Sequence, residues 1–265
     1  MDIIPLIIDR LSENFPNNVI AQAFFASMIG AILTFIGALP ALLGTRLSER
    51  VVDLGMGFSA GAMIVISFTG LIIPAIEISD FSIVAFSFIM GVIIIVLTDE
   101  FLPHEHLIKG FEGSKILKKR LRVAWLIAFA MTIHNLPEGA AVGAAIVRDI
   151  ESGVVLAIAI GLQNMPEGLA VALPFSTIKK NVKTGLLLAL FSGIVEPLIA
   201  VLTASLVFVA IYALPYALAL AAGAMIYVVS HEIIPESHRY GHERLATLGL
   251  IIGFLVMLWL DTTFT

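Results

Sequence analysis

The chain has 265 residues and a formal net charge of −5; 59% of its residues are hydrophobic and only 13% are charged. Soluble domains are about 25% charged, and the mean hydropathy of this chain is +1.04. The composition therefore excludes an ordinary soluble protein and indicates one that lies in a lipid bilayer. The chain has no cysteine, which excludes disulfide bonds and thiolate metal sites.

The first predicted element is a leader over residues 1–18, which lacks the basic region and the small-residue cleavage site of a signal peptide. We expect this extracellular or periplasmic leader to be retained and to lie at the membrane interface. After it come eight apolar runs, each long enough to cross about 30 Å of hydrocarbon as a helix. The runs cover approximately residues 19–40, 52–75, 81–98, 122–147, 153–174, 184–208, 210–232 and 245–261. We predict an all-α polytopic membrane protein, with a single transmembrane domain of eight helices over residues 19–262.

Lysine and arginine are distributed unevenly between the two sides of this predicted domain. Of the 15 Lys and Arg residues, all but Arg10 and Arg148 fall on the side that holds the loops after the first, third, fifth and seventh runs. Because positive residues gather on the cytoplasmic side of a membrane protein, the pattern predicts that both termini lie outside. It also places residues 99–121 in a cytoplasmic loop.

Two short sequences occur twice, in runs that are predicted to cross the bilayer in opposite directions. Ala-Gly-Ala-Met-Ile occupies residues 60–64 and 222–226, and Ile-Ile-Pro follows both copies. His-Asn-Leu-Pro-Glu-Gly at residues 134–139 has a counterpart, Gln-Asn-Met-Pro-Glu-Gly, at residues 163–168. Inverted repeats whose helices are interrupted by Pro or Gly are a known plan of secondary transporters, in which the substrate site lies between the repeats near the bilayer midplane.

Near the middle of the predicted spans lie seven polar residues that hydrocarbon does not tolerate without compensation. They are His134, Asn135, Glu138, Gln163, Asn164, Glu167 and Glu196. One charged residue at a helix centre costs about 2.5–3.5 kcal/mol, so the three glutamates together represent roughly 8–10 kcal/mol. Two remedies are open: the glutamates share protons by hydrogen bonding to one another, or a divalent cation neutralises two carboxylates at once.

The donor set favours a divalent transition-metal ion. Imidazole nitrogen and carboxylate and amide oxygens suit Zn²⁺, and also Fe²⁺, Mn²⁺ or Cd²⁺. Met63, at the centre of the second run, would add a thioether, although methionine on a packed helix face is common without any metal. A second polar cluster at the predicted cytoplasmic ends would receive ions that leave the centre, or consists only of solvated loop side chains. Its members are Asp99, His104, His106, His231, Glu232 and Glu236.

The two Pro-Glu-Gly motifs, followed by Ser-Gly-Ile-Val-Glu-Pro at residues 192–197, resemble those of the ZIP (Zrt/Irt-like) divalent metal transporters. The glutamine that begins the second motif resembles the GufA-like prokaryotic branch of that family, and the resemblance covers residues 20–262. It implies a binuclear metal site in which Glu138 and Glu167 bind both ions. The further ligands implied for the first site are His134, Gln163 and Met63, and those for the second site are Asn135, Asn164 and Glu196. Some members carry aspartate at the position of Asn164, so the second site here is one carboxylate poorer.

The resemblance also implies import across the cell (inner) membrane of a prokaryote, a homodimer, and an elevator-like movement of one helix bundle against another. We therefore expect a transporter and not an enzyme, with divalent metal ions and the lipid bilayer as partners and no role for nucleic acid. Two other hypotheses remain open. An intramembrane metallohydrolase would use a glutamate as the base for a metal-bound water, but the chain has no His-Glu-x-x-His pair. A proton-coupled carrier of an organic cation would leave His134 and Met63 unexplained.

Overall fold

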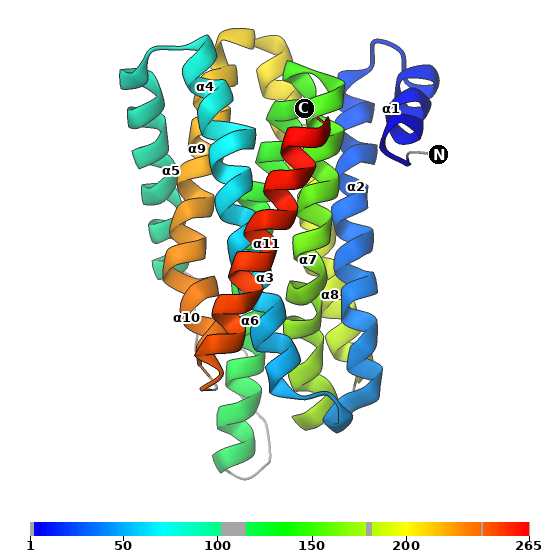
Figure 1. Ribbon diagram of the computed structural model, residues 1–265, viewed down its shortest axis with the longest axis vertical. Helices are drawn as coiled ribbons and strands as arrows, with labels where there is room; N and C mark the ends of the chain where they lie inside the picture. The colour runs from blue at the N-terminus through cyan, green and yellow to red at the C-terminus, as the bar shows by residue number, and fades with distance from the viewer. Residues whose placement is uncertain (1–2, 102–114, 179–181, 240, 265) are drawn as a thin grey trace.

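The computed structural model describes residues 3–101, 115–178, 182–239 and 241–264, which are almost entirely helical and include no β-strand. The long helices run side by side, and α1 lies with the end of α11 at one end of the molecule, opposite the start of α6 (Figure 1). In chain order the helices are α1 (Ile3–Asn14), α2 (Val19–Ala38), η1 (Leu39–Arg46), α3 (Glu49–Val65), η2 (Ile66–Ile72), α4 (Ile73–Ile78), α5 (Phe81–Phe101), α6 (Lys115–Arg148), α7 (Ile150–Ile178), α8 (Val182–Val209), η4 (Ile211–Ala213), α9 (Leu214–Val228), η5 (Val229–Ile233), α10 (Ile234–Ser237) and α11 (Glu243–Phe264).

Seven described segments are long and apolar enough to cross a bilayer, and they match seven of the eight predicted runs. These segments are Val19–Gly44, Glu49–Ile78, Phe81–Thr98, Ile150–Ser176, Val182–Val209, Ile211–Ser237 and Glu243–Phe264. The remaining run, predicted at 122–147, lies in α6, where His134, Asn135 and Glu138 lower the mean hydropathy. The all-α polytopic architecture is confirmed, whereas the eighth span stays a prediction.

Backbone polarity explains why these segments are helical. In hydrocarbon every N–H and C=O group must find a partner within the protein, and a helix supplies that partner locally. Polar side chains complete some helix starts: Asn18 Oδ1 accepts a hydrogen bond from the backbone N–H of Ala21 (3.0 Å) at the start of α2. At the start of α3, the buried carboxylate of Asp53 hydrogen-bonds to Nδ1 of His242 (2.8 Å) and so ties α3 to the start of α11.

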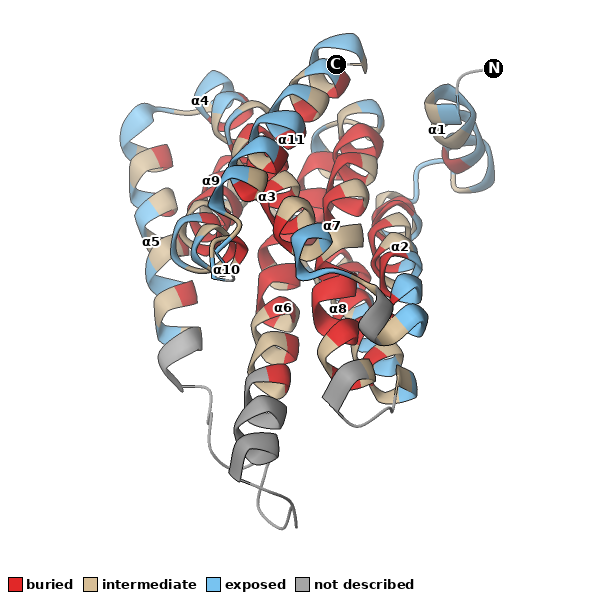
Figure 2. Cartoon of the chain, turned by 60° about the horizontal axis from the view of Figure 1, so that its bottom comes forward, coloured by how far each residue is buried: buried red, intermediate tan, exposed pale blue. Residues whose placement is uncertain are grey.

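The helices form two groups. The first, called the inner group because seven of the eight predicted ligands lie on it, consists of α2, α6, α7 and α8, which pack against one another. The second, called the outer group, consists of α3, α5, α9 and α11, and the name does not describe burial, since the spans that contain α3 and α9 are more buried than α2 and α8. In the outer group, α3 pairs with α11 and α5 pairs with α9, and α5 presents much of its surface outward (Figure 2). Glycines let backbones touch within the inner group, because a Cβ on Gly168 of α7 would lie 2.0 Å from the carbonyl oxygen of Thr34 in α2.

The Ala-Gly-Ala-Met repeat gives both copies the same backbone course. After Val65, α3 continues as the π-helix η2 and then as α4, which has Pro74 in its first turn. After Val228, α9 continues as the π-helix η5 and then as α10, which has Pro235 in its first turn. π-Helical turns inside α-helices are rare and are frequent at functional sites. The predicted inverted repeat therefore corresponds to two helices that change their winding at matching positions.

α1 lies within the predicted leader, with Leu11 buried and Ile3 exposed. Its place at the membrane interface, the outside location of both termini and the cytoplasmic location of residues 99–121 stay predictions.

Candidate metal centre

All eight residues predicted to bind the metal are buried, each at most 2% exposed. Four helices supply them: Met63 from α3; His134, Asn135 and Glu138 from α6; Gln163, Asn164 and Glu167 from α7; and Glu196 from α8. The repeated motif explains the arrangement on α6 and α7, because residues three or four apart share one face of a helix. Three of the four contributing helices belong to the inner group.

A chain of hydrogen bonds connects four of these residues across α6, α7 and α8. Gln163 Nε2 donates to Glu138 Oε1 (2.6 Å) and also to Asn164 Oδ1 (3.3 Å). Asn164 Nδ2 in turn donates to Glu196 Oε1 (2.7 Å). The two predicted metal sites therefore adjoin each other, since two neighbouring amides join a glutamate of the first to a glutamate of the second.

Glu138, Glu167 and Glu196 are each held in the same way. One oxygen, Oε1, accepts a hydrogen bond from a neutral side chain, and for Glu167 that donor is the hydroxyl of Ser59 on α3. The other oxygen, Oε2, is buried and has no hydrogen-bond partner in any of the three. A buried polar atom without a partner costs about 1–3 kcal/mol, and more when it is charged. These three oxygens are therefore positions at which a cation would be stabilising.

Orphaned polar atoms are concentrated at this centre. Among the described residues, seven buried side-chain nitrogen or oxygen atoms have no hydrogen-bond partner, and five of them belong to predicted ligands. Besides the three carboxylate oxygens they are Gln163 Oε1 and His134 Nδ1. Carboxylate oxygen and imidazole nitrogen are donors that zinc and similar ions take. The side chains present thus fit a divalent transition-metal ion.

His134 connects this centre to one of the predicted exit residues. Its Nε2 lies 2.8 Å from Glu232 Oε2 in η5. Because an ionised carboxylate only accepts hydrogen bonds, Nε2 carries a hydrogen, and in the neutral imidazole that binds metals Nδ1 then has the free lone pair. A carboxylate that holds the far nitrogen of a histidine is the usual support of histidine ligands in zinc sites. The orientation of His134 therefore suits metal binding through Nδ1.

A pocket of about 390 Å³ extends from His134 between α6 and the segment η5–α10. His231, Glu232 and Glu236 line it, so three of the six predicted exit residues border a cavity that reaches a predicted ligand. Glu236 also accepts a hydrogen bond from Arg239 Nη1 (2.9 Å). The other three predicted exit residues are not placed: the side chain of Asp99 and the residues His104 and His106 lie outside the described part of the chain.

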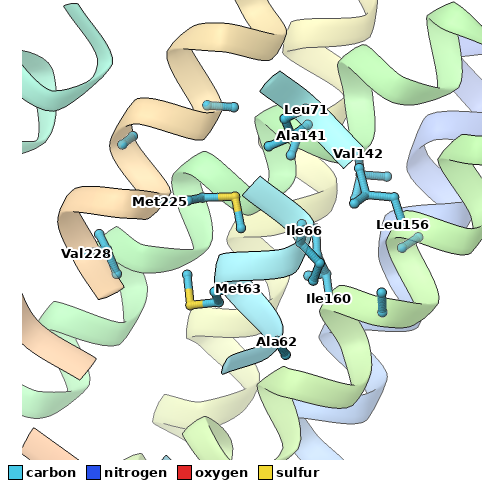
Figure 3. Packing of buried hydrophobic residues seen from close by; sticks show 14 of the residues in the cluster. Ala62, Met63, Ile66, Leu71, Ala141, Val142, Leu156, Ile160, Met225 and Val228 are labelled. Atoms are coloured by element: carbon cyan, nitrogen blue, oxygen red, sulfur yellow. The ribbon is translucent and has the colours of Figure 1, made fainter. Parts of the chain in front are cut away.

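A smaller cavity of about 170 Å³, bordered by Glu77 and Arg148, lies toward the opposite end of α6 and reaches none of the predicted ligands. Near it, buried apolar side chains of η2, α6 and α7 pack together, among them Leu71, Val142 and Ile160 (Figure 3). The larger pocket therefore reaches the centre at His134, whereas the smaller cavity borders none of the predicted ligands.

The side chains of Met63 and Asn135 are not part of the hydrogen-bonded chain that joins four of the other predicted ligands in this conformation. The thioethers of Met63 and Met225, which occupy equivalent positions in the repeat, extend into the space between α3 and α9 (Figure 3). Asn135 Nδ2 donates to the carbonyl oxygen of Ser192 in α8 (2.6 Å). Across the described ranges, no three His, Asp or Glu side chains are close enough to hold a metal ion by themselves. Completing either site therefore needs the amide and thioether donors or a movement of the helices.

Sequence analysis did not identify Ser59, whose hydroxyl bonds to Glu167. A small neutral residue in an apolar run carries little signal, because most helical serines bond only to their own backbone. The one available hint was its position four residues before Met63, which places both on one face of the same helix.

Known proteins resemble this chain over most of its length. A family model described as "ZIP Zinc transporter" matches residues 103–261. The zinc transporter ZIPB of Bordetella bronchiseptica is 38% identical over 260 residues, which cover 92% of this chain and 81% of that protein. The zinc transporter GufA of Myxococcus xanthus is 39% identical over 250 residues, with 89% and 96% covered. The zinc transporter ZupT of Chlorobaculum parvum is 32% identical over 253 residues, with 89% and 94% covered.

Proposed function

The chain belongs to the ZIP zinc-transporter family and transports divalent metal ions, zinc foremost, and we propose that its zinc path runs through the buried residues of α3, α6, α7 and α8. The family resemblance of the two Pro-Glu-Gly motifs is thereby confirmed. Because the relatives are named as zinc transporters, a transport role and not an enzymatic one is supported. Neither the metallohydrolase nor the organic-cation carrier is favoured.

In the proposed first site, zinc is bound by His134, Glu138, Gln163, Glu167 and Met63. Four of these five residues present a buried donor atom that has no hydrogen-bond partner. The fifth, Met63, is fully buried on α3 and brings a softer sulfur donor. This site combines nitrogen and oxygen donors, which suit zinc.

In the proposed second site, Asn135, Asn164 and Glu196 join the shared Glu138 and Glu167. Glu196 Oε2 has room because it lies against Gly30 of α2, where a Cβ would be only 2.1 Å from that oxygen. Asn164 brings no charge, so an ion here is neutralised by one carboxylate fewer than an aspartate at that position would allow. We expect this site to bind its ion more weakly than the first.

Transfer begins when hydrated zinc exchanges water for the carboxylates and the imidazole. Binding releases protons whenever a ligand was protonated, because only the ionised carboxylates and a bare imidazole nitrogen bind the ion. The ion then moves from His134 toward Glu232 and His231, which line the larger pocket. Glu236 provides the next carboxylate along that pocket.

The proposed direction is import, and the larger pocket is the cytoplasmic exit. The larger pocket reaches His134, whereas Leu71 and Ile160 on the other side are fully buried, so we take the side of the larger pocket to be the open one. Alternating access would follow from movement of the inner helix group against α3, α5, α9 and α11, because the site lies largely on the inner group. We further propose that the protein is a homodimer in the cell membrane of a prokaryote, with both termini outside, and that Cd²⁺, Fe²⁺ and Mn²⁺ compete with zinc.

One observation carries this proposal: the buried atoms without hydrogen-bond partners are mostly donor atoms of the predicted ligands. Uptake of radioactive zinc into proteoliposomes tests it, with the wild type compared with Glu138→Ala/Glu167→Ala. We expect the double variant to lose uptake while it remains monodisperse in detergent. Uptake at the wild-type rate by a folded double variant would refute the proposed path.

A further inference from the structure

We propose that Ser59 is a positioning residue for Glu167, which it restrains so that the carboxylate offers a single oxygen to the ion and so favours zinc over larger divalent ions. The proposal rests on the proposed function, in which Glu167 binds the transported metal. It concerns a residue that neither the motifs nor the predicted ligand set include.

The first observation is a pattern shared by three carboxylates. Glu138, Glu167 and Glu196 each have Oε1 hydrogen-bonded to a neutral donor and Oε2 buried without a partner. For Glu138 and Glu196 the donors are amides that are themselves predicted ligands. Ser59 is the third donor, and it differs because it comes from α3, outside the inner helix group. Each of the three glutamates therefore has one oxygen held by a neutral donor, and Ser59 provides that donor for Glu167.

The second observation is that Ser59 departs from the usual behaviour of hydroxyls in helices. Serine and threonine in a helix commonly donate to the carbonyl three or four residues earlier. Ser67 does so to Met63 (2.7 Å), and Thr34 does so to Gly30 (2.9 Å). The hydroxyl of Ser59, which is in the same candidate span as Ser67 and equally buried, donates instead to a carboxylate 108 residues away.

The third observation concerns the other copy of the repeat. Ser59 precedes Ala-Gly-Ala-Met in the first copy, and Ala221 precedes it in the second. The repeat therefore does not require a hydroxyl at this position for helix packing, since alanine serves in the matching helix. The hydroxyl occurs only in the copy that faces Glu167.

The chemistry follows from the number of oxygens that Glu167 offers. A hydrogen bond to Oε1 fixes the carboxylate and lowers the capacity of that oxygen to bind an ion, so Oε2 becomes the donor, and it is this one oxygen that the two proposed sites share. One oxygen from each carboxylate suits the small, usually four-coordinate zinc ion. The larger Cd²⁺ ion accommodates more donors and gains from a carboxylate that binds through both oxygens. Without the hydroxyl, Glu167 is free to rotate and to offer both.

The test uses proteoliposomes that contain the full chain, with uptake kinetics measured separately for Zn²⁺ and Cd²⁺. The variants are Ser59→Ala, which removes the donor, and Ser59→Thr, which keeps it; Ser67→Ala is the matched control in the same candidate span. Outer residues that orient a metal ligand typically change metal affinity 10–100-fold. For Ser59→Ala we expect KM for Zn²⁺ to rise by roughly 10-fold or more, kcat to change much less, and KM for Cd²⁺ to stay nearly constant.

The preference for zinc over cadmium should return in Ser59→Thr and remain intact in Ser67→Ala. The proposal is overturned if Ser59→Ala keeps the wild-type KM for zinc, or if zinc and cadmium uptake fall by the same factor. A Glu167→Ala variant run in parallel separates this proposal from the proposed function. Uptake that survives without Glu167 contradicts the function itself, whereas uptake lost without Glu167 but indifferent to Ser59 contradicts only the role of Ser59.

Discussion

α3 and α9 are the two copies of one repeated helix. Their backbones follow the same course, but they differ in the side chains that face the candidate metal centre. Both contain Ala-Gly-Ala-Met, both continue as a π-helix, and both resume as an α-helix with proline in the first turn. Before the motif, α3 has Ser59 where α9 has Ala221. Before Ile-Ile-Pro, the first copy has the fully buried Leu71 and the second copy has Glu232, which borders the larger pocket.

The proposed path has a direction although the two copies have matching backbones, so the direction must depend on the side chains in which they differ. The two copies have the same backbone course but carry different side chains at matching positions. Leu71 lies in the hydrophobic core, whereas Glu232 hydrogen-bonds to His134 and borders the larger pocket, which is the proposed exit. Substitutions at matched positions of the two copies therefore separate effects on the stability of the repeated backbone from effects on zinc transport.

The largest effect that we expect is a loss of stability when the close packing of the repeated helices is disturbed, and the loss should be similar in both copies. A Cβ on Gly61 or on Gly223 would lie 2.0 Å from a backbone carbonyl oxygen of the neighbouring helix, Leu250 for Gly61 and Phe88 for Gly223. Because backbone atoms cannot yield as a side chain does, we expect Gly61→Ala and Gly223→Ala each to cost about 3 kcal/mol of stability. The thermal midpoint at which monodisperse protein is lost in detergent measures this.

Gly70→Ala is the matched control for these two variants, since its Cβ would meet only the flexible end of Leu156 at 3.1 Å. A shared backbone arrangement would be refuted if one of the two variants had the same thermal midpoint as Gly70→Ala and the other had a lower one.

A smaller but still large effect is expected when the second copy is made to resemble the first at the exit. Glu232→Leu removes the hydrogen-bond acceptor of His134 Nε2 and places an apolar side chain in the larger pocket. Since outer partners of metal ligands change affinity or activity by 10–100-fold, we expect zinc uptake to fall by roughly that factor. Glu236 lines the same pocket but pairs with Arg239 and not with His134. We therefore expect zinc uptake to fall less in Glu236→Leu than in Glu232→Leu. Equal losses in the two variants would argue against a special role for Glu232.

The smallest expected effect compares the two methionines of the repeat. Met63→Leu and Met225→Leu conserve volume at fully buried positions, so each should cost less than about 1.5 kcal/mol of stability. Only Met63 is proposed to bind the ion, so we expect Met63→Leu to weaken zinc binding severalfold and Met225→Leu to leave it unchanged. Zinc affinities measured by equilibrium dialysis test the comparison. If both variants bind zinc like the wild type, sulfur is not a ligand.

Most of the fold could be predicted from the sequence because a bilayer restricts the choices. Apolar runs of sufficient length become helices, since no other open structure satisfies the backbone in hydrocarbon. The run in α6 is the instructive exception: it is not among the seven candidate spans, because the polar side chains of the candidate site lower its mean hydropathy. The π-helical turns after Val65 and Val228 had no signal beyond the nearby proline.

The candidate site was predictable where its residues are costly to bury. His134, Glu138, Glu167 and Glu196 stood out because ionisable groups are rare within apolar runs. The contact between His134 and Glu232 and the one between Ser59 and Glu167 were not predictable, since each joins residues about a hundred positions apart. Such contacts depend on how the outer helices pack against the inner group, which periodicity along one helix does not determine.

The central claim is that the buried, unpartnered donor atoms of α6, α7 and α8 bind the transported zinc. X-ray absorption at the zinc edge of the purified, zinc-loaded protein tests it most directly, with Glu138→Ala/Glu167→Ala measured beside the wild type. We expect nitrogen and oxygen donors at about 2.0–2.2 Å, imidazole among them, together with the sulfur of Met63, and a double variant that retains little or no zinc. The same zinc content and the same donor shell in both proteins would contradict it.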